Sequence, residues 1–246
     1  MTVIYPPKGK ALEYSPLACN LYRGCQHGCS YCYAPNVLYM KRETFNATAV
    51  PRKDIIKQVR REAPEYRGID DYVLFCFTSD PYQPCEAEHR ITRQAIEIFI
   101  ENDVPFQILT KGGELARRDF DLLESVKTRC KFGTTLLFTN EQDRLKWEPG
   151  AATIQQRIDA IQDAHDRGIP TWVSIEPVID PAQAIELIGQ INYIVDFWKI
   201  GKLNYHPIAK EIDWKAFAEK AIETLESVHA KYYIKNDLRA YLKGAA

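Results

Sequence analysis

The chain has 246 residues, 46% of them hydrophobic, and is long enough to bury a substantial core as one domain. Its 32 basic and 33 acidic side chains leave a formal net charge of −1, which excludes a strongly basic field for nucleic acid or anionic membrane but leaves a local basic groove open. No stretch approaches the ~20 apolar residues that span a bilayer, and no signal peptide pattern is present, so we expect a cytoplasmic protein.

Short apolar runs alternate with helical patterns, which predicts repeated strand–helix units, a parallel sheet and an α/β fold. The predicted strands are Asn20–Arg23, Tyr72–Phe77, Phe106–Leu109, Lys131–Leu137, Thr171–Ile175 and Tyr193–Lys199. The predicted helices are Arg52–Arg61, His89–Asn102, Leu115–Val126, Ile154–Arg167, Pro181–Gly189 and Trp214–Lys231. Gly168 and Pro170 mark the clearest boundary, because glycine ends helices and proline cannot continue them. We expect one domain over residues 1–246, with a C-terminal helix and tail from about residue 214.

Polar residues follow several predicted strands at the point where each strand ends. An open sheet and a partial or full barrel would both give this pattern, and in either one the ligand lies beyond the C-terminal ends of the strands. The residues concerned, in chain order, are Cys25, Cys29 and Cys32, then Ser79, Asp80 and Cys85, then Lys111, and finally Glu176. We therefore expect these loops to form one site.

Three of the seven cysteines lie within eight residues, CQHGCSYC, which indicates a metal site rather than a disulfide framework. Thiolates suit iron–sulfur clusters and zinc alike, and a closed site of either kind needs four protein ligands. None of the scattered cysteines, Cys19, Cys76, Cys85 and Cys130, repeats a paired spacing, and His27 is too close to its neighbours to reach the same metal. Three ligands would leave one iron open for chemistry; a zinc site closed by a scattered cysteine, or three incidental thiols, is the alternative.

The CxxxCxxC loop with Tyr31 before its last cysteine resembles the radical S-adenosylmethionine superfamily. The stretches SPLACNLYRGCQHGCSYCYAP, TSDPYQPCE and ILTKGGELARRD are similar to the branch that contains spore photoproduct lyase and its shorter relatives, and the resemblance runs from Tyr14 to about Ile179. It implies a partial (β/α)6 barrel of the radical SAM type, a 4Fe-4S cluster and S-adenosylmethionine. It also implies reductive cleavage to methionine and a 5'-deoxyadenosyl radical, which abstracts hydrogen from a substrate.

The resemblance assigns roles to individual residues. Cys25, Cys29 and Cys32 match the cluster ligands, and Tyr31 matches the aromatic position beside the adenine. Further cofactor contacts carried over are Ser79 for the methionyl amino group with Asp80 beside it, Lys111 for the carboxylate, and Thr134 or Thr135 for the ribose or carboxylate. Each has a plainer alternative, because Ser79 and Asp80 precede Pro81 and could start a turn, and Lys111 could be an exposed loop lysine.

Catalytic candidates are fewer. Spore photoproduct lyase uses a strand cysteine as hydrogen donor, and that position here is Phe77. Cys76 is one residue away, so strand alternation should point it away from Ser79 unless a bulge intervenes. Cys85 is better placed at the mouth of the sheet, although the interpretation as a buried or incidental loop thiol is favoured over a catalytic role. Glu176 could line the substrate cavity or pair with an arginine such as Arg157.

The leading interpretation is a radical enzyme with an unidentified substrate, of lyase or transferase type, that receives electrons from a flavodoxin or ferredoxin. Thymine-dimer repair is a same-chemistry alternative, which Phe77 and the lack of an appended nucleic-acid module argue against. The helix Arg52–Arg61 has a local positive excess, but its apolar stripe is typical of an ordinary outer helix. A non-catalytic iron–sulfur electron carrier or a zinc-stabilised binding module is the alternative of another class.

Overall fold

The computed structural model describes residues 2–47 and 49–243, and its centre is an eight-stranded sheet in the order β1-β2-β5-β6-β7-β8-β9-β10. β1 pairs antiparallel with β2, and every later pairing is parallel, which confirms the predicted α/β class. The strands are β1 Ile4–Tyr5, β2 Leu17–Cys19, β5 Val73–Phe75, β6 Phe106–Thr110, β7 Cys130–Thr135, β8 Thr171–Val178, β9 Phe197–Lys202 and β10 Tyr232–Ile234.

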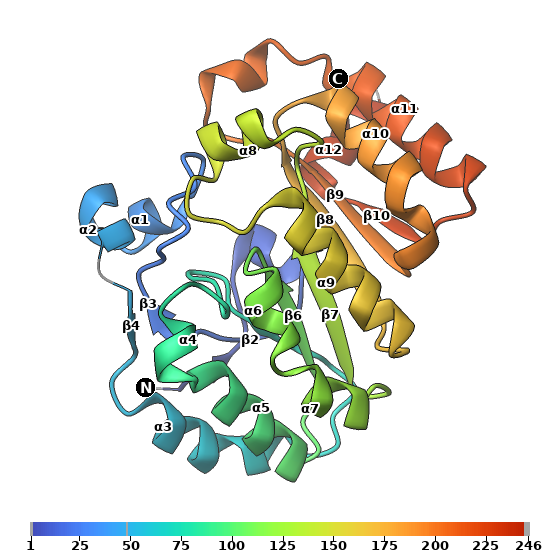
Figure 1. The fold of residues 1–246 in the computed structure, drawn as a ribbon. Helices are drawn as coiled ribbons and strands as arrows, with labels where there is room; N and C mark the ends of the chain where they lie inside the picture. The colour runs from blue at the N-terminus through green and yellow to red at the C-terminus, as the bar shows by residue number, and fades with distance from the viewer. Residues whose placement is uncertain (1, 48, 244–246) are drawn as a thin grey trace.

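Helices follow the strands along the chain and line the outer side of the sheet (Figure 1). The α-helices are α1 Ala34–Val37, α2 Arg42–Ala47, α3 Ile55–Glu62, α4 Glu86–His89, α5 Ile91–Glu101, α6 Glu114–Arg117, α7 Phe120–Ser125, α8 Glu141–Trp147, α9 Ile154–Asp166, α10 Pro181–Ile191, α11 Trp214–Ser227 and α12 Asn236–Arg239. Short 3-10 turns are η1 Gly9–Glu13, η2 Ala63–Tyr66, η3 Asn192–Ile194, η4 Pro207–Lys210 and η5 Ala240–Lys243. None of the described helices is long and apolar enough to cross a membrane.

Local sequence signals explain the long helices. Thr153 and Gln156 form a capping box at the start of α9, and Gly168 follows that helix with a φ of +69°, a conformation that glycine adopts without steric cost. The Asp180 carboxylate caps α10, which begins with a proline, and the Asp213 carboxylate caps α11. These caps confirm the predicted starts of the three helices, whereas α11 ends at Ser227 rather than at Lys231 and the last predicted strand, Tyr193–Lys199, lies later, at β9.

Several predicted elements were wrong. The strand predicted at Asn20–Arg23 lies earlier, at β2, and Tyr22–Arg23 forms β3, which pairs with β4 (Val50–Pro51) in a separate two-stranded sheet. The helix predicted at His89–Asn102 is divided at Arg90, whose φ is +50°. The C-terminal segment is more than a helix and tail, because β10 adds a parallel strand beside β9.

The connection between β1 and β2 reaches across to the opposite edge of the sheet. The Glu13 carboxylate accepts hydrogen bonds from the Tyr233 hydroxyl at 3.0 Å and the Asn236 N–H at 2.8 Å. Lys10 forms an ion pair with Asp237 at 2.6 Å. The sheet therefore curves so far that η1 joins β10 and α12, closing the open side of the partial barrel and leaving a concave interior.

Candidate functional site

The cysteine loop follows β3 and is held by backbone contacts from several elements. The Cys25 N–H donates to the Phe45 carbonyl at 3.0 Å, and the Arg42 guanidinium donates to the carbonyls of Cys29 at 3.0 Å and Cys32 at 2.8 Å. On its other side the loop packs against Gly150, whose N–H donates to the His27 carbonyl at 2.9 Å. The loop therefore has a fixed shape before any ligand is considered.

The thiols of Cys25, Cys29 and Cys32 lie close enough for their charges to act on one another. Burial raises the pKa of Cys25 well above its usual value, and the charges of the other two cysteines raise it further. Burial also raises the pKa of Cys29 to about 12, while the nearby Lys111 ammonium acts in the opposite direction. Three mutually close thiols that require a positive partner to ionise fit an iron–sulfur cluster, whose irons supply that charge.

Among the described residues, no three His, Cys, Asp or Glu side chains are grouped around a point that could hold one metal ion. All seven cysteines are free. In a 4Fe-4S cluster each cysteine binds a different iron, so a cluster does not require its ligands to converge on one atom.

Asp80 joins the loops that follow β5 and β6 to the cysteine loop. Its carboxylate accepts from the Thr110 hydroxyl at 2.5 Å and from the N–H groups of Tyr82 and Lys111, both at 2.8 Å. The buried imidazole of His27 lies 3.3 Å from the same carboxylate. Although burial opposes it, the charge of His27 and these hydrogen bonds keep the pKa of Asp80 well below its usual range. Both carboxylate oxygens of Asp80 thus accept hydrogen bonds from protein groups, which agrees with the alternative interpretation that Asp80 begins a turn.

Glu148 is a buried residue of the site that the sequence did not indicate. Its carboxylate accepts from the Tyr31 hydroxyl and forms an ion pair with Arg157 at 2.6 Å, with the two side chains 0% and 1% exposed. Although burial would raise it, the charges of Arg157 and Lys111 keep the pKa of Glu148 below its usual value. Glu148 therefore fixes Tyr31 and helps to balance Lys111, whose ammonium lies 5.8 Å from the Tyr31 ring centre.

The two threonines of β7 lie on opposite faces of the sheet. The Thr134 hydroxyl donates to the Thr110 carbonyl at 2.8 Å, on the face where Phe132 packs against Phe120 of α7. Thr135 shares the other face with Gly133, against which the Trp172 indole lies. Of this pair, Thr135 therefore faces the concave interior. At the end of β5, Ser79 Oγ is buried and has no hydrogen-bond partner in the described part of the chain.

The expectation that Cys76 points away from Ser79 was wrong. β5 ends at Phe75, so strand alternation no longer fixes the direction of the next side chain. Burial raises the pKa of Cys76 to about 12, and the Leu21 N–H and the Ser79 hydroxyl are among the groups that act against this shift. The thiol thus lies near Ser79, but it is packed in the hydrophobic core.

Cys85 packs under the cysteine loop. Its N–H donates to the Gln26 side chain at 2.7 Å, and the Gln83 side chain accepts from the Gln26 N–H at 2.9 Å. Burial raises the pKa of Cys85 to about 11, and Glu86 adds to this shift. These contacts place the residue in the support of the loop.

Glu176 belongs to a polar network inside the barrel. It forms an ion pair with Lys235 at 2.8 Å and accepts from the Tyr14 hydroxyl, whereas Arg157, the expected alternative partner, binds Glu148. Its side chain lies so close to Gly201 that a Cβ there would be 2.6 Å from its carboxyl carbon. Burial raises the pKa of Glu176, against the charge of Lys235.

Lys199 lies in the same interior. It donates to the carbonyls of Glu13 at 2.6 Å and Tyr14 at 2.9 Å. Burial, and then the charge of Lys235, lower the pKa of Lys199 to about 8. The polar interior is thus built by β8, β9, the segment after β10 and the η1 connection, which are far apart in sequence.

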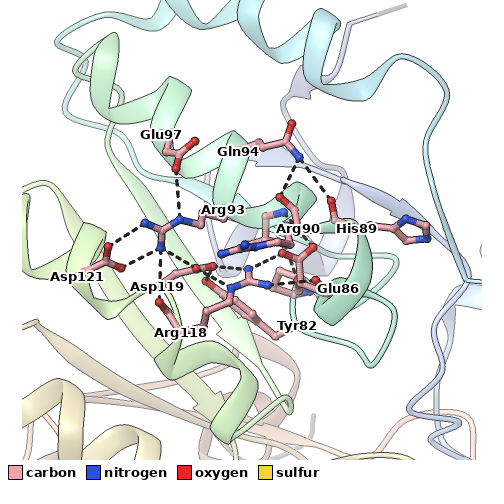
Figure 2. A network of polar contacts seen from close by, with 12 residues as sticks. Tyr82, Glu86, His89, Arg90, Arg93, Gln94, Glu97, Arg118, Asp119 and Asp121 are labelled. Atoms are coloured by element: carbon pink, nitrogen blue, oxygen red, sulfur yellow. Dashed lines mark hydrogen bonds and ion pairs between the residues drawn. The ribbon is translucent and has the colours of Figure 1, made fainter.

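A second ion-pair network holds the helices beside these loops, as Figure 2 shows. The fully buried carboxylates of Glu86 and Asp119 each accept from Arg118 at 2.6 Å, and Asp119 also accepts from the Tyr82 hydroxyl at 3.1 Å. Arg93 adds contacts from α5 to Asp119 at 3.1 Å. Arg118 and Asp119, in the ELARRD motif, thus support the loop that carries Asp80.

Comparison with known proteins places this geometry in a family. A family model described as the Radical SAM superfamily matches residues 19–189. An uncharacterised protein of Methanocaldococcus jannaschii is 28% identical over 188 residues, which cover 75% of this chain and 69% of that protein. A protein of Pseudomonas phage M6 described as a radical SAM Nalpha-GlyT isomerase is 30% identical over 156 residues, which cover 63% of this chain and 31% of that protein.

Solved structures share the fold. A mutant of spore photoproduct lyase matches with a TM-score of 0.72 at 15% identity, over 96% of this chain and 79% of that one. Streptococcus suis SuiB bound to its precursor peptide SuiA matches with a TM-score of 0.67 at 14% identity, over 92% of this chain and 51% of that one. These identities show the fold alone. The family model covers more than half of the sequence, and the chain belongs to the radical SAM superfamily.

Proposed function

We propose that Cys25, Cys29 and Cys32 hold a 4Fe-4S cluster and that this chain acts on S-adenosylmethionine and a second, unidentified substrate. The family uses both the cluster and S-adenosylmethionine. When bound, the cluster supplies the electron that splits S-adenosylmethionine into methionine and a 5'-deoxyadenosyl radical, which abstracts hydrogen from the substrate. The observation that carries the proposal is the mutual proximity of three thiols beside Lys111.

The surrounding residues suit the binding of S-adenosylmethionine. Burial would lower the pKa of the Lys111 ammonium, but the charges of Cys29 and Glu148 raise it. Lys111 therefore stays charged and can pair with the methionyl carboxylate. Ser79 offers an unpartnered hydroxyl to the methionyl amino group. Tyr31, held by Glu148, offers its ring to the adenine, and Thr135 offers its hydroxyl to the ribose. Asp80 acts as a positioning residue, because it fixes the Lys111 backbone.

Water exclusion is the task of the interior network. Tyr14 lies inside the barrel, with its ring centre 6.1 Å from those of both Phe77 and Trp172, and its hydroxyl bonds Ser174 and Glu176. A radical needs such a dry, rigid wall to avoid quenching. Glu176 is engaged with Lys235 and Tyr14, which supports a wall role over proton transfer.

The test begins with anaerobic reconstitution. Wild type should bind four irons per chain, its reduced EPR signal should change on addition of S-adenosylmethionine, and dithionite should then yield 5'-deoxyadenosine. Alanine variants of Cys25, Cys29 or Cys32 should lose all three properties. Cys130→Ala is the matched control, because this thiol is buried against Leu123 and apart from the loop.

Two outcomes would contradict the proposal. An EPR signal that S-adenosylmethionine leaves unchanged would indicate a four-ligand electron carrier, and zinc in place of iron would indicate a structural site.

A flavodoxin or ferredoxin that replaces dithionite in the same assay would identify the electron donor. Among the alternative activities, thymine-dimer repair is supported by the fold of spore photoproduct lyase. The sequence resemblance places Phe77 where that enzyme has its hydrogen-donor cysteine, which argues against repair.

A further inference from the structure

We propose that a cavity beside β1 binds an anionic group, carboxylate or phosphate, of the radical's substrate; this inference rests on the proposed function. The cavity has a volume of about 470 Å³, within the usual range of ~300–1,000 Å³ for ligand sites. The residues that line it and carry the argument are Tyr5, Asn20, Leu38, Arg52, Lys53 and Thr78.

The cavity borders the proposed cofactor site. Asn20 follows β2 directly, and its side-chain oxygen accepts from the N–H groups of Phe77 at 2.8 Å and Thr78 at 3.0 Å. Thr78 adjoins Ser79, the proposed contact of the methionyl group. Leu38 follows α1, the helix directly after the cysteine loop. A substrate in this cavity would therefore lie beside the ends of β2 and β5, where the radical is formed.

The charge of the cavity is positive. Of the described residues that line it, two are cations, Arg52 and Lys53, and none is a carboxylate. Neither cation forms an ion pair with any described residue, and the Arg52 charge acts on the Tyr5 hydroxyl. By contrast, Lys235 of the barrel interior is already paired with Glu176. The two free charges are thus available to an incoming anion.

The polar groups around Arg52 suit the same ligand. The Asn20 amide donates to the Tyr5 oxygen, which leaves the phenolic hydrogen to donate to a ligand. A guanidinium, an ammonium and a phenol that converge on one cavity form a donor set for planar or tetrahedral anionic oxygens. Arg52 and Lys53 are both exposed, but they line a cavity together with a phenolic hydroxyl, and this arrangement favours a binding site over isolated surface cations.

The test measures anion binding separately from radical chemistry. Reconstituted enzyme with S-adenosylmethionine is dialysed to equilibrium against labelled inorganic phosphate or labelled acetate at about 0.15 M salt, where weak long-range attraction is screened. We expect at least one anion to bind, and Arg52→Gln to weaken it by at least about tenfold. Adding Lys53→Gln to Arg52→Gln should weaken anion binding further. Lys57→Gln is the matched control, because Lys57 is exposed on α3, the helix that follows Arg52 and Lys53, but does not line the cavity.

The anion that binds more tightly identifies the substrate group. The inference is overturned if neither anion binds, if Arg52→Gln binds both as wild type does, or if Lys57→Gln causes an equal loss. Uncoupled formation of 5'-deoxyadenosine with dithionite is measured in parallel and should survive in Arg52→Gln. If wild type itself forms none, the proposed function fails, whereas the dialysis result still decides the anion site.

Discussion

Replacing Glu148 with glutamine removes a negative charge from the centre of the site while keeping its shape. Arg157, 1% exposed, would lose its partner, and its Nη2 already has no hydrogen-bond partner among the described residues. Lys111 would lose one of the three charges that raise its pKa, those of Cys29, Glu148 and Asp80. The variant would thus leave two cations facing each other in a region with little water.

The size of the effect follows from the burial of the pair. Breaking a buried ion pair by removing one partner costs about 3–5 kcal/mol. At about 2–4 °C per kcal/mol for a chain of this size, the midpoint of thermal unfolding should fall by about 6–20 °C. Glu101→Gln breaks the Arg60–Glu101 pair, whose side chains are 55% and 61% exposed, and should cost at most about 1 kcal/mol.

Circular dichroism of the anaerobic, reconstituted proteins measures these midpoints. The double variant Glu148→Gln/Arg157→Met should recover much of the loss, because no uncompensated charge then remains on Arg157. The EPR response to S-adenosylmethionine should weaken in Glu148→Gln, since the Tyr31 hydroxyl exchanges a charged carboxylate acceptor for a weaker neutral amide oxygen. A midpoint shift no larger than that of Glu101→Gln, or no recovery in the double variant, would refute the reasoning.

Gly150→Ala should lower the iron content and the unfolding midpoint, because an added Cβ would lie 2.2 Å from the Gln26 carbonyl oxygen. Gly189→Ala, in open space on α10, should instead raise the free energy of unfolding by about 0.5–1 kcal/mol and therefore raise the midpoint. Lys199→Met should remove a pH dependence of the free energy of unfolding. The pKa of Lys199 is about 8 in the folded state and 10.5 in the unfolded state, so the unfolded chain binds more protons between these two pH values. The free energy of unfolding of the wild type should therefore rise by up to about 3 kcal/mol as the pH increases through this range, and that of Lys199→Met should not.

Iron analysis and unfolding midpoints decide the glycine prediction, and normal iron content in Gly150→Ala would show that the loop can shift. Midpoints at pH 7 and 9.5 decide the lysine prediction. If the difference between wild type and Lys199→Met stays constant over that interval, the pKa of Lys199 is not lowered.

Sequence reasoning located the site through local patterns. The spacing of Cys25, Cys29 and Cys32 is a property of eight consecutive residues, and folding elsewhere does not alter it. The alternation of strands and helices predicted the parallel sheet, and parallel strands place their C-terminal ends at one edge. Lys111 and Asp80 meet the cysteine loop for this reason.

Predictions from local sequence patterns were wrong at the ends of strands. Strand alternation misplaced Cys76 because β5 ends one residue earlier, and the first predicted strand was displaced because Asn20 turns its side chain toward Phe77 and Thr78. Thr134 and Thr135 could not be separated, because the sequence does not say which face of β7 meets α7.

The sequence by itself determined the cysteine loop, the family resemblance and the edge of the sheet at which the candidate site lies. Only the tertiary structure decided which polar groups meet: Glu148 with Tyr31, 117 residues away, and Glu13 with Tyr233, 220 residues away. The physical reason is that a hydrogen bond depends on distance in space, which the path of the whole chain sets, whereas a cysteine spacing depends only on covalent neighbours. The partial barrel and the cavity lined by Arg52 and Lys53 are therefore properties of the fold.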